Sequence, residues 1–210
     1  MGVDPYELFG RILVMISSIV SWILIVVWLN GDKAGGFGGR STDLESSAFT
    51  AYFNWHPLLM ATTFILLMPI GVSAFEIFPL KRIVNKWIHG ILNTLSLIGL
   101  CGGFYVIIDC HKNIAKRELA TTIHAYCGYI TFASVIITYL AGFIFFVLKM
   151  GTFNLKQQVK ILHKNFGFYS LLFGIATTIM GLDEKTDTVK GNLNLPKGSI
   201  IFVYGIQRQK

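Results

Sequence analysis

The 210-residue chain is 53% hydrophobic and only 14% charged, whereas charged residues make up about a quarter of an ordinary soluble domain. This composition excludes a soluble enzyme and indicates an integral membrane protein. The net charge of +7 would suit nucleic-acid binding, but the basic residues gather in short loops between apolar stretches. We therefore expect a lipid bilayer as partner and no nucleic acid.

Five apolar stretches are long enough to cross a bilayer. A spanning helix needs about 20 mainly apolar residues, and within lipid only helices and closed barrels satisfy their backbone hydrogen bonds. The stretches comprise residues 9–29, 51–78, 86–108, 120–148 and 159–182. The first is too long for the apolar part of a signal peptide. We predict an all-α membrane bundle of five spanning helices, with residues 1–185 as the transmembrane domain and 186–210 as a C-terminal tail.

The charges between the stretches predict the orientation of the chain. The first, third and fifth loops mix acidic and basic residues, whereas the second and fourth carry basic residues without acids. These are Lys81, Arg82 and Lys86 in the second loop, and Lys149, Lys156 and Lys160 in the fourth. Loops rich in lysine and arginine face the cytosol. The amino terminus is then cytosolic, and the other three loops lie on the far side.

Four of the five histidines lie about one turn inside the start of separate spanning stretches: His56, His89, His124 and His163. An ionisable side chain within a membrane span is costly and by default indicates a functional site. The predicted topology places His56 and His124 near the far surface, and His89 and His163 near the cytosolic surface. Helix bundles build cofactor sites from inward-facing side chains, and imidazoles are axial ligands of haem iron. We predict two bis-histidine haem sites.

Three alternatives remain for the histidines. Any one of them could simply form a hydrogen bond with a neighbouring helix. Zinc is the rival metal, but a structural zinc site uses four clustered ligands, and these histidines come in pairs. A proton relay would bring Asp or Glu into the spans, where Glu76 is the only acid within the predicted stretches.

Basic residues precede both cytosolic histidines at the same two offsets. Arg82 and Lys86 lie seven and three residues before His89, as do Lys156 and Lys160 before His163. Such spacings share one helical face. They indicate a cation cluster for haem propionates and a small anionic reductant, although lysines that extend to lipid headgroups would give the same pattern.

Four sequence motifs resemble those of the cytochrome b561 family of ascorbate-dependent transmembrane electron carriers. They are FNWHPLLM (53–60), KWIH (86–89), TTIH (121–124) and MGLDEK (180–185), and the resemblance covers roughly residues 8–185. It implies that each histidine pair binds a haem b within four central helices. It also implies that cytosolic ascorbate donates an electron near Arg82, Lys86 and Lys156. The far face would then reduce monodehydroascorbate or a ferric chelate, as an oxidoreductase of the ferric-reductase type.

The resemblance also leaves alternatives for the whole chain. The family has six helices, whereas the apolar run 200–206 is too short to span a bilayer, which predicts a truncated or atypical last helix. A truncated isoform could be a non-catalytic haem-binding or regulatory protein. A transporter is a third alternative, which the lack of inverted repeats disfavours. A homodimer is compatible with this interpretation, as is location in an endomembrane or the plasma membrane.

Overall fold

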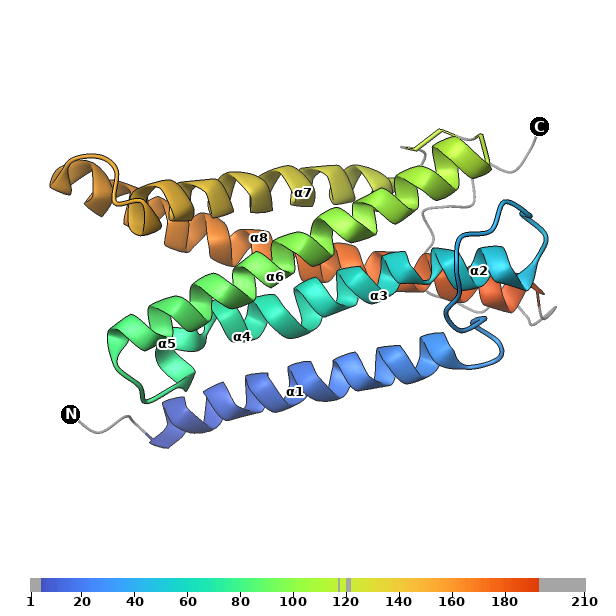
Figure 1. Cartoon of the computed structure of the whole chain (residues 1–210). Coiled ribbons are helices and arrows are strands. Elements are labelled where there is room, and N and C mark those ends of the chain that lie inside the picture. The colour runs from blue at the N-terminus through green and yellow to red at the C-terminus, as the bar shows by residue number, and fades with distance from the viewer. Residues whose placement is uncertain (1–4, 117, 120–121, 193–210) are drawn as a thin grey trace.

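The computed structural model describes residues 5–116, 118, 119 and 122–192 of the chain. All regular structure in these residues is helical, and the long helices run side by side along one direction (Figure 1). This arrangement confirms the all-α bundle expected from the sequence. The expected atypical last helix falls mainly in residues 193–210, outside the described residues, as do Ala120 and Thr121 near the start of the fourth stretch.

Five described helical spans are long and apolar enough to cross a membrane, as predicted. The first is α1 (Pro5–Asn30). The second joins α2 (Ser47–Phe53), α3 (Trp55–Ala61), the π-helical segment η1 (Thr62–Leu67) and α4 (Met68–Val72), and the short α5 (Ala74–Ile77) follows it. The third joins α6 (Arg82–Ile108) and η2 (Asp109–Ile114), and the fourth joins α7 (Ile123–Gly142) and η3 (Phe143–Val147). The fifth is α8 (Phe153–Asn192).

Prolines account for the interruptions in the second span. A proline inside a helix lacks the N–H that would bond four residues back, and its ring crowds that carbonyl. Pro57 lies one turn after Phe53, where α2 gives way to α3 at Asn54. Pro69 follows the π-helical η1, whose wider turns separate the backbone groups that the ring would otherwise meet.

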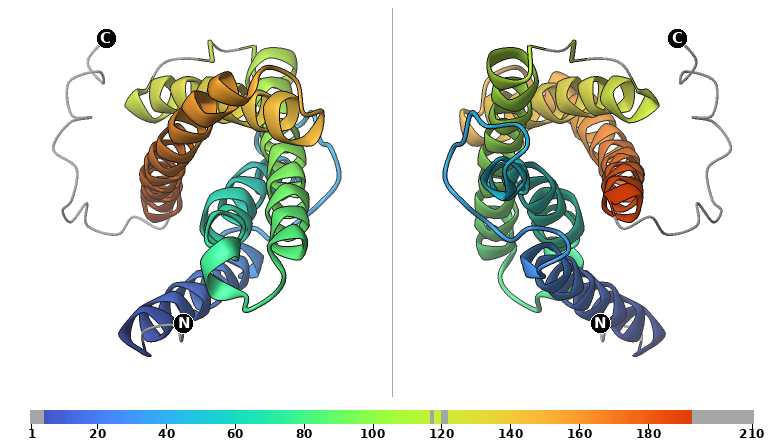
Figure 2. Two further views of the ribbon diagram at one scale, coloured as in Figure 1. Left: turned by 90° about the vertical axis from the view of Figure 1, so that its left-hand side faces the viewer. Right: turned by 90° about the vertical axis from the view of Figure 1, so that its right-hand side faces the viewer.

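The last four spans form a bundle, and α1 lies outside it. Figure 2 looks along the bundle and shows α1 against the second span only, where it contacts α3, η1, α4 and α5. The indole of Trp22 donates a hydrogen bond to the Thr62 hydroxyl there, at 2.9 Å. Side chains from all four bundle spans meet in a buried core of Met60, Phe64, Met68, Leu100, Val135 and Leu171.

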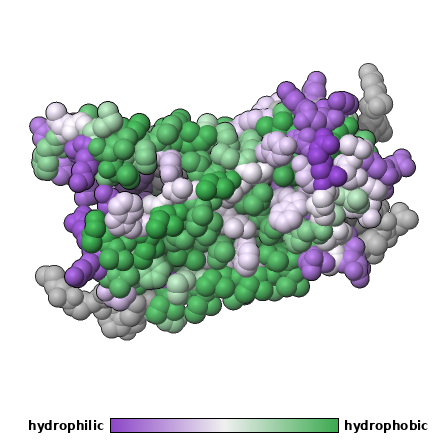
Figure 3. Space-filling model, in the orientation of Figure 1, coloured by the Kyte–Doolittle hydropathy of each residue, from purple (hydrophilic) through white to green (hydrophobic). Residues whose placement is uncertain are grey.

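The surface has an apolar belt between two polar ends (Figure 3). We call one end the basic end; it holds the start of α1, α5, the start of α6, η3 and the start of α8. The other, the far end, holds the end of α1, α2, η2 and the start of α7 (Figure 1). Many large apolar side chains on α1 and α7 are exposed along the belt. Such exposure fits helices that face lipid rather than water.

The loop between α1 and α2 is fastened onto the far end. Asn54 is fully buried and its amide donates hydrogen bonds to the carbonyls of Ala34 and Gly36, at 2.8 and 2.7 Å. The indole of Trp55 donates to the carbonyl of Gly38. Gly36 has a φ of +64°, a backbone conformation that glycine adopts without strain.

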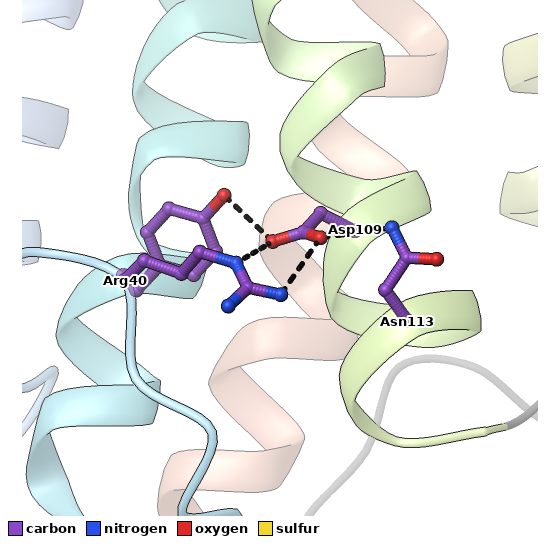
Figure 4. A network of polar contacts seen from close by, with 4 residues as sticks. Arg40, Asp109 and Asn113 are labelled. Carbon is purple, nitrogen blue, oxygen red and sulfur yellow. Dashed lines mark hydrogen bonds and ion pairs between the residues drawn. The ribbon is translucent and has the colours of Figure 1, made fainter.

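The same loop forms an ion pair with the third span. Arg40 contacts Asp109 at 2.7 Å, and Tyr52 and Asn113 also donate hydrogen bonds to this carboxylate (Figure 4). The partnership with Asp109 raises the pKa of Arg40. The prediction that Glu76 is the only acid within a span is wrong. The third span continues as η2 to Ile114 and so includes the buried Asp109, whereas Glu76 is exposed on α5.

Candidate metal centres

The structure brings the four membrane histidines together in two pairs. His56 on α3 faces His124 on α7, with ring centroids 6.3 Å apart and ring planes at 75°. His89 on α6 faces His163 on α8, with centroids 6.2 Å apart and planes at 74°. The first pair lies towards the far end and the second towards the basic end. Second and fourth spans are thus joined at one site, and third and fifth at the other.

Each of these histidines uses its Nδ1 in a hydrogen bond to a backbone carbonyl of another helix. His56 bonds to Gly103 at 2.9 Å, His89 to Gly71 at 2.7 Å, His124 to Thr177 at 3.0 Å and His163 to Thr138 at 3.0 Å. A carbonyl can only accept, so Nδ1 carries the hydrogen. The tautomer that remains presents Nε2 as the lone-pair nitrogen, which is the arrangement of a metal-ligating histidine.

The spacing of each pair fits a metal held between two imidazoles. An imidazole nitrogen lies about 2 Å from a bound transition metal and the ring centre about 1 Å further, so rings on opposite sides have centres about 6 Å apart. Among the described residues, no third His, Cys, Asp or Glu joins either pair as a potential ligand. A two-nitrogen donor set of this kind suits an iron whose other ligands come from a macrocycle, so both sites fit haem.

A cavity of about 410 Å³ surrounds the far-end pair. Both His56 and His124 line it, and aromatic and small side chains such as Phe104 and Gly128 form its walls. His111 and Lys185 also line it, and Lys185 lies over the ring of Phe53 at 5.3 Å. The cavity therefore combines apolar walls with nitrogen ligands and nearby polar groups, as cofactor pockets do.

A family model described as eukaryotic cytochrome b561 matches residues 55–188, which include all four paired histidines. The chain belongs to the cytochrome b561 family. This membership confirms the resemblance inferred from the motifs, and the family implies binding of haem b.

Similar proteins include two kinds of reductase. The "transmembrane ascorbate-dependent reductase CYB561" of Homo sapiens is 30% identical over 159 residues, which cover 75% of this chain and 59% of the relative. The protein of that name from Mus musculus is 31% identical over 134 residues, covering 63% and 53%. The "plasma membrane ascorbate-dependent reductase CYBRD1" of Mus musculus is 27% identical over 192 residues, covering 88% and 62%. The chain thus spans less than two thirds of each of these relatives.

The three residues predicted to bind the anionic reductant, Arg82, Lys86 and Lys156, all lie at the basic end of this member of the family. Lys86 is half-buried and its Nζ donates a hydrogen bond to the carbonyl of Phe146 in η3, at 2.8 Å. Arg82 is exposed at the start of α6, and Lys156 is half-buried in the first turn of α8. The Phe146 ring meets the edge of His163, with centroids 5.6 Å apart. Lys86 is therefore connected to the basic-end histidine pair through a single neighbouring residue.

Sequence reasoning missed the groups that orient the histidines. The acceptors at Gly71, Gly103, Thr138 and Thr177 are backbone carbonyls, which every residue type has. No pattern of side chains could indicate them. The ion pair between Arg40 and Asp109 was also missed, although an acid at the end of an apolar stretch and an arginine in a mixed loop were both visible in the sequence.

Proposed function

We propose that this chain binds two haems b and carries electrons from ascorbate at the basic end to monodehydroascorbate or ferric iron at the far end. The observation that carries the proposal is the presence of two histidine pairs at opposite ends of one bundle, each with metal-ligand spacing and with Nδ1 occupied. The relatives named as ascorbate-dependent reductases support the choice of donor.

The haem, when bound, would supply reversible one-electron chemistry at iron. His56 and His124 would hold one haem, and His89 and His163 the other. The carbonyl bonds to Nδ1 fix the tautomer and limit rotation of each ring, so the ligands are preorganised. The buried apolar side chains of Phe64 and Leu100 belong to the core of the bundle and also line the far-end cavity, so the haem there would have apolar neighbours.

The basic end provides the charges for an anionic donor. Arg82, Lys86 and Lys156 lie on the helices that carry His89 and His163, one or two turns away from these histidines. Ascorbate carries a negative charge at neutral pH, so lysine and arginine can hold it by charge-assisted hydrogen bonds. By the positive-inside rule this end faces the cytosol.

The haem content of the purified protein tests the proposal. We expect a pyridine haemochrome assay to find two haems b per chain, and His56→Ala to lose one haem while retaining the other. Lys33→Ala is the control, because Lys33 is exposed in the loop between α1 and α2 and does not line the far-end cavity, and it should keep both. Absence of haem, or zinc in its place, would overturn the proposal.

Electron transfer across a vesicle separates this function from that of a non-catalytic haem protein. Ascorbate enclosed on the basic-end side should reduce a ferric chelate outside, at a rate that depends on both histidine pairs. A protein that binds haem but shows no such transfer would be the regulatory alternative.

A further inference from the structure

Helices α7 and α8 repeat one arrangement around the histidine of the other helix. The carbonyl of Thr138 on α7 accepts the Nδ1 hydrogen of His163, and Gly142 follows four residues later. The carbonyl of Thr177 on α8 accepts from His124, and Gly181 again follows four residues later. Residues four apart lie on the same face of a helix. Each carbonyl and its glycine therefore border the same imidazole.

At these two glycines the imidazole of one helix packs directly against the backbone of the other: His163 against Gly142, and His124 against Gly181. A Cβ at Gly142 would lie 2.6 Å from Cε1 of His163, and a Cβ at Gly181 would lie 2.6 Å from Cε1 of His124. Both distances are far inside van der Waals contact. An added methyl group would force the ring to shift or turn.

The other two histidines are held differently. Their acceptor carbonyls belong to Gly71 and Gly103, and a Cβ at these positions would meet side chains of the packing helix, Asn93 and Met60, at closest approach. Those glycines allow close helix packing. Of these four glycines, Gly142 and Gly181 are the two that leave room for the ligand ring itself.

We propose that Gly142 and Gly181 are positioning residues that set the planes of His163 and His124, one for each metal centre. The inference rests on the proposed haem function. In each pair, this plane stands nearly perpendicular to that of the opposite histidine, at 74° and 75°. Groups that fix the orientation of a ligating imidazole tune its metal, and the anisotropy of the electron paramagnetic resonance (EPR) signal of low-spin ferric haem reports the angle between two axial imidazoles. The two glycines thus tune the two sites independently.

Alanine variants of the full-length protein in detergent test this inference by EPR and redox titration. Gly142→Ala should shift the ferric signal and the midpoint potential of the basic-end haem only, and Gly181→Ala those of the far-end haem only. Histidine-to-alanine variants assign each signal to its site. Gly10→Ala is the control, because Gly10 lies on α1 with nothing within 4 Å of an added Cβ, and it should change neither signal. Alanine favours helices more than glycine does, so lost helix propensity would not explain an effect.

A rescue experiment covers the case in which Gly142→Ala loses its haem altogether. In His163→Gly protein supplied with free imidazole, the ligand is no longer tethered to α8 and can shift away from a methyl group on α7. Gly142→Ala should then cause no further loss of haem. An equal loss with and without the tether would overturn the inference, as would unchanged signals in both glycine variants, or both signals shifting in each. A wild-type protein without haem would instead overturn the proposed function.

Discussion

Each paired histidine gives its Nδ1 hydrogen to a neutral carbonyl rather than to a carboxylate. A carboxylate partner would raise the basicity of the imidazole and add a negative charge next to the metal. A carbonyl fixes the ring without adding a charge, which suits a site within a low-dielectric membrane span. Because the accepting carbonyl belongs to another helix in every case, these hydrogen bonds also join the helices in pairs.

Among the three residues proposed to bind the anionic electron donor, Lys86 offers the most direct test of that binding by replacement. If it holds an anionic donor, Lys86→Ala should weaken the apparent affinity for ascorbate, while reduction by a neutral reductant stays normal. Loss of a charged hydrogen bond costs about 1.5–3 kcal/mol, and about 1.4 kcal/mol is a tenfold change in an equilibrium constant. The concentration dependence of haem reduction, followed by absorbance, should therefore shift about tenfold or more.

Lys33→Ala provides the control for this change of charge. Lys33 is exposed in the loop at the opposite end, so its removal should leave the dependence on ascorbate unchanged. Added salt should weaken wild-type reduction more than that of Lys86→Ala, because screening acts on the charge that was removed. If all reductants slow equally in Lys86→Ala, the lysine only anchors η3 through the Phe146 carbonyl.

The positions of the histidines could be predicted from sequence because depth and topology determine them. His56 and His124 start spans entered from the same side, so their proximity follows once the spans are known. The perpendicular ring planes could not be predicted in this way. They depend on where Gly142 and Gly181 come to lie against a neighbouring helix, which requires the relative rotation of two helices and not only their apolar lengths.

At the scale of elements, the π-helical segments and α8 depart most from the expected helices. The segments η1, η2 and η3 lie within the described second, third and fourth spans. The segments η1 and η3 are apolar whereas η2 is polar, so no common hydropathy distinguishes π-helical segments from the flanking α-helices. Pro69 lies two residues after η1 and favours a wider turn there. The fifth span begins at Phe153 rather than 159, because a helix can continue in polar residues beyond the lipid.

The contact between η1 and α8 supports a prediction about stability. Phe64 is only 2% exposed, and a Cβ at Gly174 would collide with its ring. Gly174→Ala should therefore destabilise the protein by about 1–3 kcal/mol, the usual cost of overpacking. Phe64→Leu should relieve this clash, so the double variant should be more stable than Gly174→Ala alone. Thermal unfolding in detergent of the wild type, the two single variants and the double variant completes a double-mutant cycle. Purely additive changes in stability would contradict the predicted clash.

The ion pair at the far end makes a prediction about the loop between α1 and α2. Arg40→Ala should lower the unfolding temperature, because the buried carboxylate of Asp109 would then have fewer donors. The stability of Arg40→Lys should lie between those of the wild type and Arg40→Ala, since lysine keeps the charge but not the bidentate geometry. The rate of proteolysis within the loop and the unfolding temperature report the effect. Lys33→Ala in the same loop should change neither, and an Arg40→Ala protein as resistant as wild type would contradict the prediction.

For the whole molecule, composition and apolar length were sufficient to predict five spans and an all-α bundle. Long apolar stretches leave few alternatives in lipid, where the backbone must bond within its own helix. The place of α1 outside the four-helix bundle was not predictable in the same way. The apolar content of α1 does not distinguish contact with lipid from contact with a neighbouring helix, and the contact depends on pairings such as that of Trp22 with Thr62.

The orientation of the bundle gives the last prediction. The loops at the basic end carry exposed Lys81, Arg82 and Lys149, and the positive-inside rule places them in the cytosol. A protease-cleavable tag at the amino terminus should be protected from added protease in sealed right-side-out vesicles. A tag inserted at Gly39 should be cleaved, because Gly39 is exposed at the far end and has open space around it. The opposite pattern would exchange the two faces and leave Lys86 on the side away from cytosolic ascorbate.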